Sequence, residues 1–96
     1  MEVRYKIFYH HFVVHEDIPK LPKIWRNKIR AAVEKRLTTN PDLYGKPLRR
    51  SLKGFYKLRV GDYRVIFRIE KNKVKILAIK HRSVVYDEAK QRETLL

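Results

Sequence analysis

The residues from Phe55 to Tyr86 constrain the fold more than any other stretch, because they predict three short antiparallel strands joined by two tight turns. They read FYKLRVGDYRVIFRIEKNKVKILAIKHRSVVY. Alternation of polar and apolar residues is typical of a half-buried strand. Gly61-Asp62 is a favoured two-residue hairpin turn, and a second turn is expected around Lys71-Asn72.

The first turn also predicts the register of the hairpin. If Gly61 and Asp62 form the whole turn, the opposed pairs are Val60 with Tyr63, Arg59 with Arg64, and Leu58 with Val65. A slip of one residue would move every side chain to the other face, and the apolar period in three consecutive strands argues against such a slip.

This register sorts the strands into two faces. The face that helices should cover holds Tyr56, Leu58, Val60, Tyr63, Val65, Phe67, Ile69, Val74, Ile76 and Ala78. The opposite face, called the basic face below, holds Lys57, Arg59, Arg64, Arg68 and Lys75, with His81 at its end and Ile66, Leu77 and Ile79 among them. Like charges directly opposite in a sheet are destabilising, so stability alone would not place Arg59 against Arg64.

The segments outside this stretch predict helices and a loop. Val3 to Tyr9 alternates and predicts a strand, and Phe12 to Asp17 predicts a short helix with a bend near Pro19. Residues 22–38 carry the strongest helical stripe, which Asn40-Pro41 ends. The remaining expectations are a connecting loop over residues 42–54, and a tail over residues 84–96 with a helical turn or two from Asp87 to Thr94, capped by Ser83 or Asp87.

Together these elements predict an α+β fold in a single domain over residues 1–96. An N-terminal strand, two helices on one face of a small antiparallel sheet and a short C-terminal helix or tail are expected.

The charge indicates a polyanionic partner. The chain has 24 Lys and Arg against 10 Asp and Glu, a net charge of +14. Self-repulsion at this level destabilises a compact state. Binding to nucleic acid, an acidic protein or an anionic membrane surface would explain why the chain carries this charge. The alternative is a basic surface that only keeps the protein soluble.

Other composition features narrow the setting. The chain has no cysteine, which excludes disulfides and cysteine-ligated metals and fits a reducing compartment. No apolar run of signal-peptide or membrane-span length is present, so a cytoplasmic protein without a membrane partner is expected.

The end of the first predicted strand carries residues that could bind a metal ion. His11 and His15 are four residues apart, with His10 and Glu16 nearby. A tetrahedral zinc site usually needs four ligands, so surface histidines are the favoured interpretation and no metal or cofactor is expected.

The basic face suits RNA cleavage by the RNA's own 2′-hydroxyl. That reaction needs a base for the hydroxyl, cations for the phosphorane-like transition state and a proton for the leaving 5′ oxygen. Lys57 is a candidate base, Arg59 and Arg64 can bind phosphate oxygens bidentately, and His81 can act as base or acid. Tyr86 can stack on a base or orient the phosphate. Each of these residues alone is more often a solvated side chain.

The segment LYGKPLRRSLKGFYKLRVGDYRVIFRIEKNKVKILAIKHRSVVYDEA resembles toxins of the RelE/ParE superfamily. The shared features are a leucine-lysine-glycine lead-in, an aromatic-K-L-R strand, G-D-Y-R and a terminal H-R-x-x-V-Y. The upstream KLPKIWRNKIRAAVEKRL is similar to that family's second helix. The resemblance covers nearly the whole chain.

The resemblance to the RelE branch implies a metal-independent endoribonuclease, an mRNA interferase that cleaves mRNA in the ribosomal A site and so inhibits translation. The catalytic residues that it implies, together with the alternation, are Lys57, Arg64, His81, Arg82 and Tyr86. The residues expected to bind RNA phosphates are Arg59, Lys80, Lys53 and Arg50. One departure is Phe55, which stands where some members carry a lysine. Alternation favours His81 over its two neighbours as the residue that faces the site, although strand ends often bulge.

Two other functions remain open. A ParE-like toxin would poison DNA gyrase without RNA chemistry, and it shares the fold. A plain nucleic-acid-binding module would show only salt-dependent affinity.

The expected partners are mRNA with the ribosome and a cognate antitoxin whose acidic or flexible segment folds on the basic surface. Oligomers are expected only through the antitoxin complex. Exposed side chains of Ile66, Leu77 and Ile79 are predicted to offer this segment an apolar groove.

Overall fold

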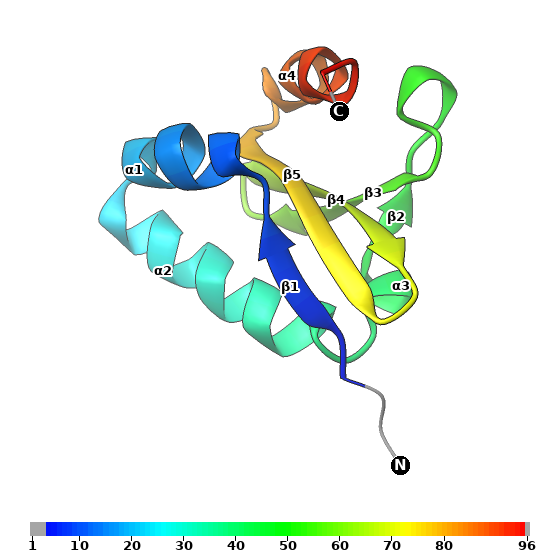
Figure 1. Ribbon diagram of the computed structural model, residues 1–96. Helices are drawn as coiled ribbons and strands as arrows, with labels where there is room; N and C mark the ends of the chain where they lie inside the picture. The colour runs from blue at the N-terminus through cyan, green and yellow to red at the C-terminus, as the bar shows by residue number, and fades with distance from the viewer. Residues whose placement is uncertain (1–3, 96) are drawn as a thin grey trace.

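The computed structural model describes residues 4–95, and it has a mixed five-stranded sheet with helices on both faces (Figure 1). The sheet order is β1-β5-β4-β3-β2. The strands are β1 (Lys6–Tyr9), β2 (Lys46–Pro47), β3 (Phe55–Val60), β4 (Tyr63–Glu70) and β5 (Lys73–His81). The helical segments are η1 (Val13–Asp17), α1 (Ile18–Lys20), α2 (Lys23–Ala32), η2 (Val33–Leu37), α3 (Pro41–Tyr44), η3 (Arg50–Leu52) and α4 (Val85–Glu93).

The predicted α+β class is confirmed, and so is the hairpin register. Val60 pairs with Tyr63, Arg59 with Arg64 and Leu58 with Val65 in antiparallel β3 and β4. Gly61 adopts φ +60°, the left-handed conformation that this turn requires, and its Cα faces the indole of Trp25. Helix α2 therefore packs directly on the turn. Strand β1 joins the other edge in parallel with β5, which makes the sheet mixed.

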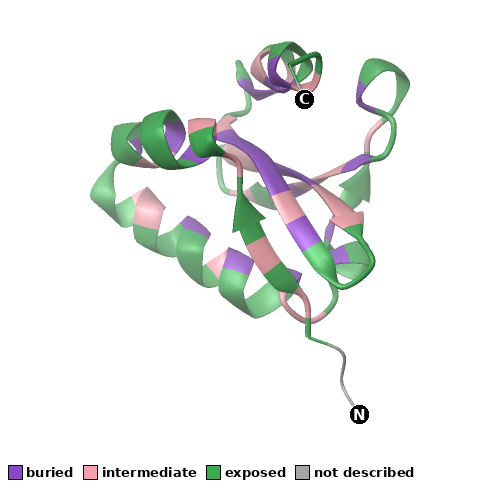
Figure 2. Cartoon of the chain, in the orientation of Figure 1, coloured by how far each residue is buried: buried purple, intermediate pink, exposed green. Residues whose placement is uncertain are grey.

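Two apolar clusters lie on opposite faces of the sheet. The first cluster lies under α1, α2 and η2, and it contains Val13, Leu21, Ile29, Val33, Leu37, Leu58, Val65, Phe67, Val74, Ile76 and Ile79. The second lies under α4 and contains Leu52, Phe55, Ile66, Leu77, Ala78, Val85 and Ala89. Figure 2 shows the resulting buried positions along β5, which has an apolar cluster on each side.

A β-bulge in β5 changes the predicted faces. Ile66 pairs with Ala78, but the next residue of β4, Phe67, pairs with Ile76, so Leu77 has no partner. The extra residue reverses the alternation beyond it. The prediction that Ala78 faces the main helices and Ile79 the basic face is therefore wrong, because Ala78 lies in the second cluster and Ile79 in the first.

Three further expectations are corrected by the helical segments. The chain stays helical through Pro19, which stands in the first turn of α1, and it bends at Leu21, whose backbone is extended. The expected loop after Asn40 contains α3, β2 and η3. Helix α4 confirms the expected C-terminal helix, but neither Ser83 nor Asp87 caps it, because its N-cap is Val84. Val3, the predicted first residue of the N-terminal strand, lies outside the described residues.

No helix among residues 4–95 is both long and apolar enough to cross a membrane.

Candidate functional site

Four unpaired cations gather on the basic face where β2, β3 and β4 run side by side. Lys46 on β2 is opposite Lys57 on β3, and Arg59 on β3 is opposite Arg64 on β4. We call Lys46, Lys57, Arg59 and Arg64 the cationic cluster. Within the described part of the chain, none of the four has a carboxylate within 4.0 Å. Together with Tyr44 they line a pocket of ≈ 170 Å³.

Nearby cations on the same face share a carboxylate partner within the chain. Arg68 lies 3.1 Å from a carboxylate oxygen of Glu70, and Lys75 lies 2.7 Å from the other. The hydrogen bond from Lys75, followed by the charges of Arg68 and the neighbouring lysines, lowers the pKa of the Glu70 carboxyl. The basic face is therefore divided into a paired half and the unpaired cationic cluster.

The hairpin turn holds the guanidinium of Arg64. Its Nη1 donates to the carbonyl oxygens of Gly61 at 2.8 Å and of Tyr63 at 2.9 Å. A guanidinium has five N–H donors, so two such bonds position it and leave donors for a phosphate. The Gly61-Asp62 turn thus both sets the register of the hairpin and orients the guanidinium of Arg64.

Tyr86 is brought to the cationic cluster by α4. The Nζ of Lys57 lies 5.8 Å from the centroid of the Tyr86 ring, within the range of a cation–π contact. Tyr86 also packs on the second apolar cluster, whose members Val85 and Ala89 come from the same helix. The predicted site residues Lys57, Arg59, Arg64 and Tyr86 therefore lie together.

A buried ion pair ties α4 to the rest of the fold. Arg92 on α4 donates from Nη1 and Nη2 to the two carboxylate oxygens of Asp17 on η1, both at 2.7 Å. Nη1 also donates to the carbonyl oxygen of Leu77 at 3.0 Å, while the backbone N–H of Ile79 donates to Asp17 at 2.9 Å. These bonds join α4, η1 and β5 at one point, and α4 carries Tyr86.

The ion pair shifts both ionisable groups toward their charged forms. Burial raises the pKa of the Asp17 carboxyl, but hydrogen bonds from Arg92 and Ile79 and the charges of Arg92 and Lys80 outweigh it, so the pKa lies below its ordinary value. Burial lowers the pKa of Arg92, and its bonds to Asp17 more than compensate and raise it. The sequence did not predict the pairing of Asp17 with Arg92, because the two residues are 75 positions apart and no local pattern links them.

The other predicted residues do not line the pocket of the cationic cluster. The bulge turns His81 to the face of Tyr63, with the two ring centroids 5.8 Å apart, so the prediction that His81 ends the basic face is wrong. Lys80 instead lies opposite Arg64, but its Nζ is 3.3 Å from Asp17. Arg82 stays at the turn, where its backbone N–H donates to the carbonyl oxygen of Asp62 at 2.9 Å.

Arg50 and Lys53 lie in the segment between β2 and β3, the green lobe of Figure 1. Both are exposed, and Leu52 between them anchors the lobe in the second apolar cluster. Arg50 has φ +57°, an unusual left-handed conformation for a residue other than glycine. The structure presents these two cations on a separate projection from the cationic cluster.

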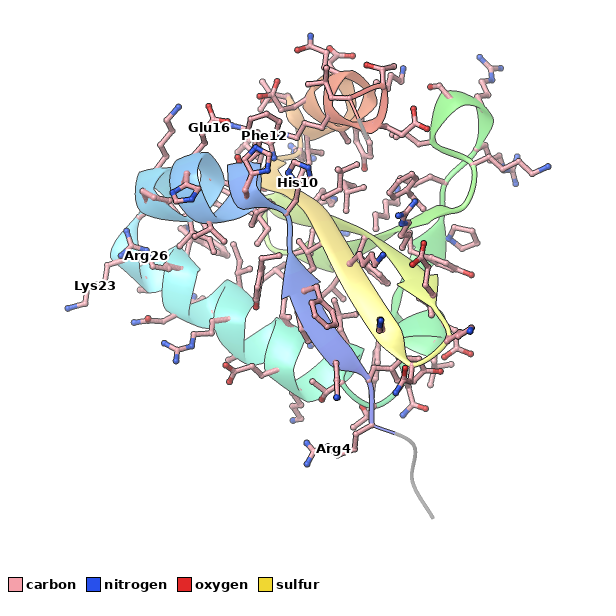
Figure 3. All side chains as sticks on the ribbon, viewed as in Figure 1. Arg4, His10, Phe12, Glu16, Lys23 and Arg26 are labelled. Atoms are coloured by element: carbon pink, nitrogen blue, oxygen red, sulfur yellow. The ribbon has the colours of Figure 1, made fainter. Side chains whose placement is uncertain are left out.

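The histidines near β1 form an aromatic group. The rings of His10 and His11 are stacked with centroids 4.5 Å apart, and the ring of Phe12 lies 5.0 Å from that of His10. Figure 3 shows His10 and Phe12 together near Glu16 at the start of the first helical segment. Over residues 4–95, no three His, Cys, Asp or Glu side chains are grouped as a metal ion would need.

Comparison with known proteins identifies the family. Residues 5–86 match the family described as the ParE toxin of type II toxin–antitoxin system, parDE. Two Mycobacterium tuberculosis proteins, Toxin RelE and Toxin RelG, are each 41% identical over 76 residues. The matches cover 73% of this chain in both cases, and 74% of RelE and 83% of RelG.

Solved structures show the same fold. The chain is similar to a chain of the toxin–antitoxin complex RelBE2 from M. tuberculosis, with a TM-score of 0.78 and 32% identity over 84% of this chain and 94% of that one. A conserved hypothetical protein from Helicobacter pylori, HP0894, has a TM-score of 0.61 at 14% identity, covering 82% of this chain and 96% of that one. The expected kinship is confirmed: the chain belongs to the RelE/ParE superfamily of type II toxin–antitoxin toxins, and it is RelE-like.

Proposed function

We propose that this toxin is an endoribonuclease that cleaves mRNA on the ribosome through attack of the RNA's 2′-hydroxyl, and thereby inhibits translation. The observation that carries the proposal is the unpaired cationic cluster beside Tyr86, on a sheet face whose other cations have carboxylate partners. Identity of 41% to Toxin RelE and Toxin RelG supports the RelE-like activity.

The arrangement suggests a role for each residue. Arg59 and Arg64, opposite one another on β3 and β4, bind the scissile phosphate and neutralise the charge that develops in the transition state. Lys57 lies beside Tyr86 and lines the same pocket as the two arginines. Its uncharged amine takes the proton of the 2′-hydroxyl, and the leaving 5′ oxygen takes a proton from the solvent. Tyr86 stacks on a neighbouring base or orients the phosphate. The whole step uses side chains and the substrate's own hydroxyl, so it needs no metal ion.

The test of this site uses the double variant Arg64→Ala/Tyr86→Ala, with Arg68→Ala as the matched control. Arg68 is on the same strand and face as Arg64, but it is paired with Glu70. The double variant should keep the wild-type circular dichroism spectrum and lose growth arrest on induction, while Arg68→Ala should arrest growth as the wild type does. A folded double variant that still halts growth places the activity elsewhere.

The chemistry is tested with purified protein, ribosomes and a defined mRNA. Mapping 5′ ends should reveal cuts within codons, and the upstream products should end in a 2′,3′-cyclic phosphate. An mRNA with a single 2′-deoxynucleotide at the mapped position should resist cleavage there only. Cleavage of the deoxy-substituted site would refute attack by the 2′-hydroxyl. DNA damage on induction without new mRNA ends would instead support the ParE-like alternative, a gyrase poison.

We also propose a cognate antitoxin as the partner, with an acidic segment that covers the cationic cluster. The similar M. tuberculosis structure is itself a toxin–antitoxin complex. The predicted docking groove is wrong, because Ile66, Leu77 and Ile79 are exposed by only 0%, 3% and 2% and belong to the two cores. Charge is the remaining attraction, so the purified toxin should bind the product of the adjacent gene more weakly when the cationic cluster is changed to alanines. Binding of that variant with wild-type affinity would contradict the proposed role of charge.

A further inference from the structure

The pocket at the cationic cluster extends beyond the residues assigned to cleavage. Its lining adds Tyr44, the last residue of α3, and Lys46, the first residue of β2, to Lys57, Arg59 and Arg64. Neither Tyr44 nor Lys46 takes part in the proposed chemistry. An aromatic ring next to cations that lack carboxylate partners is the combination by which proteins hold single-stranded nucleic acid.

The backbone between these two residues is held against the core. Gly45 is buried, and its N–H donates to the carbonyl oxygen of Pro41 at 2.9 Å. A Cβ at Gly45 would lie 2.5 Å from Cζ of Phe67 and 2.9 Å from the Pro41 oxygen, so only glycine fits there. This close approach sets the positions from which Tyr44 and Lys46 reach the pocket.

The ring of Tyr44 remains accessible. The residue is 46% exposed, although aromatic rings are normally placed where they bury most of their area. The guanidinium carbon of Arg36 lies 5.8 Å from the ring centroid, over one face. A ring with a cation over one face has its other face available for stacking, and the cation draws the ring's electrons toward the covered side.

We propose that Tyr44 and Lys46 form a nucleotide subsite beside the cleavage site, in which Tyr44 stacks on an RNA base and Lys46 binds the adjoining phosphate. This inference rests on the proposed function for the identity of the strand as RNA. A nucleotide is the favoured occupant because the pocket combines an open ring with cations on three adjacent strands. An acidic peptide would need only the cations.

The test measures binding without cleavage, using a fluorescein-labelled 2′-O-methyl RNA oligonucleotide and fluorescence anisotropy. Tyr44→Ala should weaken binding by about 5- to 150-fold, the range for loss of one base–aromatic stack. Tyr44→Phe and Tyr44→Trp should bind as the wild type does, since stacking needs the ring and not the hydroxyl. The matched control is Leu43→Ala, because Leu43 is 73% exposed on the same helix and does not line the pocket.

A second set of oligonucleotides moves a single abasic residue along the strand. At one position the abasic residue should weaken binding to the wild type by the same factor as Tyr44→Ala, and should have no further effect on Tyr44→Ala. The proposal is overturned if Tyr44→Ala binds normally, if Tyr44→Phe loses as much as Tyr44→Ala, or if abasic effects are identical in both proteins. Weakened antitoxin binding by Tyr44→Ala with unchanged RNA binding also overturns it, and assigns the pocket to an acidic peptide.

The same variants separate this inference from the proposed function. In the ribosome assay, Tyr44→Ala should raise KM and leave kcat near the wild-type value, because Tyr44 contacts a base and not the reacting atoms. Cleavage with an unchanged KM would refute the subsite and leave the endoribonuclease intact. Ring-dependent binding without any cleavage by the wild type would refute the endoribonuclease and leave the subsite.

Discussion

The buried pair of Asp17 and Arg92 gives the sharpest stability prediction. Their side chains are exposed by 0% and 4%, and they meet through two hydrogen bonds of 2.7 Å. The substitution Arg92→Met keeps the aliphatic volume and removes the charge. It leaves the Asp17 carboxylate buried with Lys80, at 3.3 Å, as its nearest cation.

Breaking one side of a buried pair costs about 3–5 kcal/mol, because the remaining charge is uncompensated. Lys80 and the N–H of Ile79 still contact Asp17, so the lower end of the range, about 3 kcal/mol, is expected for Arg92→Met. The double variant Asp17→Asn/Arg92→Met removes both charges, and the amide oxygen can still accept from Ile79. It should lose only about 1 kcal/mol, the cost of one neutral hydrogen bond.

The assay is urea unfolding of the wild type, both single variants and the double variant at neutral pH. The double-mutant cycle should give a coupling free energy of at least about 2 kcal/mol. Hydrogen exchange should become faster in α4 of Arg92→Met than in β3 and β4, since the pair joins α4 to β5. A single variant that loses less than about 1 kcal/mol, or costs that simply add, would refute the reasoning.

Three further predictions follow from the same contacts and charges. Folding lowers the pKa of Asp17, so the stability that its carboxylate contributes is complete above the ordinary carboxyl pKa of about 4 and is lost as the pH falls through the folded pKa. The free energy of unfolding should therefore fall less steeply with acid in Asp17→Asn/Arg92→Met than in the wild type. Equal slopes in the two proteins would contradict this. Gly61→Ala should lower the free energy of unfolding by about 1–3 kcal/mol in thermal unfolding, because φ is +60° and a Cβ would lie 2.3 Å from the Trp25 ring. Unchanged stability would show that the turn relaxes. Arg64→Ala should reduce the slope of log affinity for RNA against log salt by about 0.7, while Arg68→Ala should change this slope little, because Arg68 is paired with Glu70. Equal changes in the two variants would show that this pairing does not affect RNA binding.

The hairpin could be predicted from the sequence because two local signals agreed. Alternation placed Leu58 and Val65 on one face, and Gly61-Asp62 set the register that the structure shows. The agreement placed Arg59 opposite Arg64, with Lys57 on the same face, and so located three of the four residues of the cationic cluster. Local patterns were sufficient here because both strands and their turn are contiguous in the chain.

The prediction failed where alternation stops. Residues 76–79 read Ile-Leu-Ala-Ile, a continuous apolar run typical of a strand buried on both faces. Such a run indicates that another element covers the basic face as well. Helix α4 is this element, and it covers Ile66 and Leu77. The bulge at Leu77 depends on how β4 and β5 pack between two cores, and no local residue pattern announces it.

Lys46 and Tyr44 were missed for a different reason. Strand β2 has only two residues, too few to show a period, and α3 has four. Their place beside Lys57 follows from the packing of Gly45 against Phe67, a contact between segments over 20 residues apart.

The contacts of Asp17 also govern whether this protein can associate through its sheet. Strand β1 pairs with β5 only as far as Ile76, so the remaining length of β5 would present open backbone groups at an edge. The carboxylate of Asp17 occupies the N–H of Ile79, and Arg92 occupies the carbonyl oxygen of Leu77. An edge with its donors and acceptors taken by side chains cannot template a strand from another copy. Loss of the ion pair should therefore promote β-sheet aggregation as well as loosening α4, even in a chain with a net charge of +14.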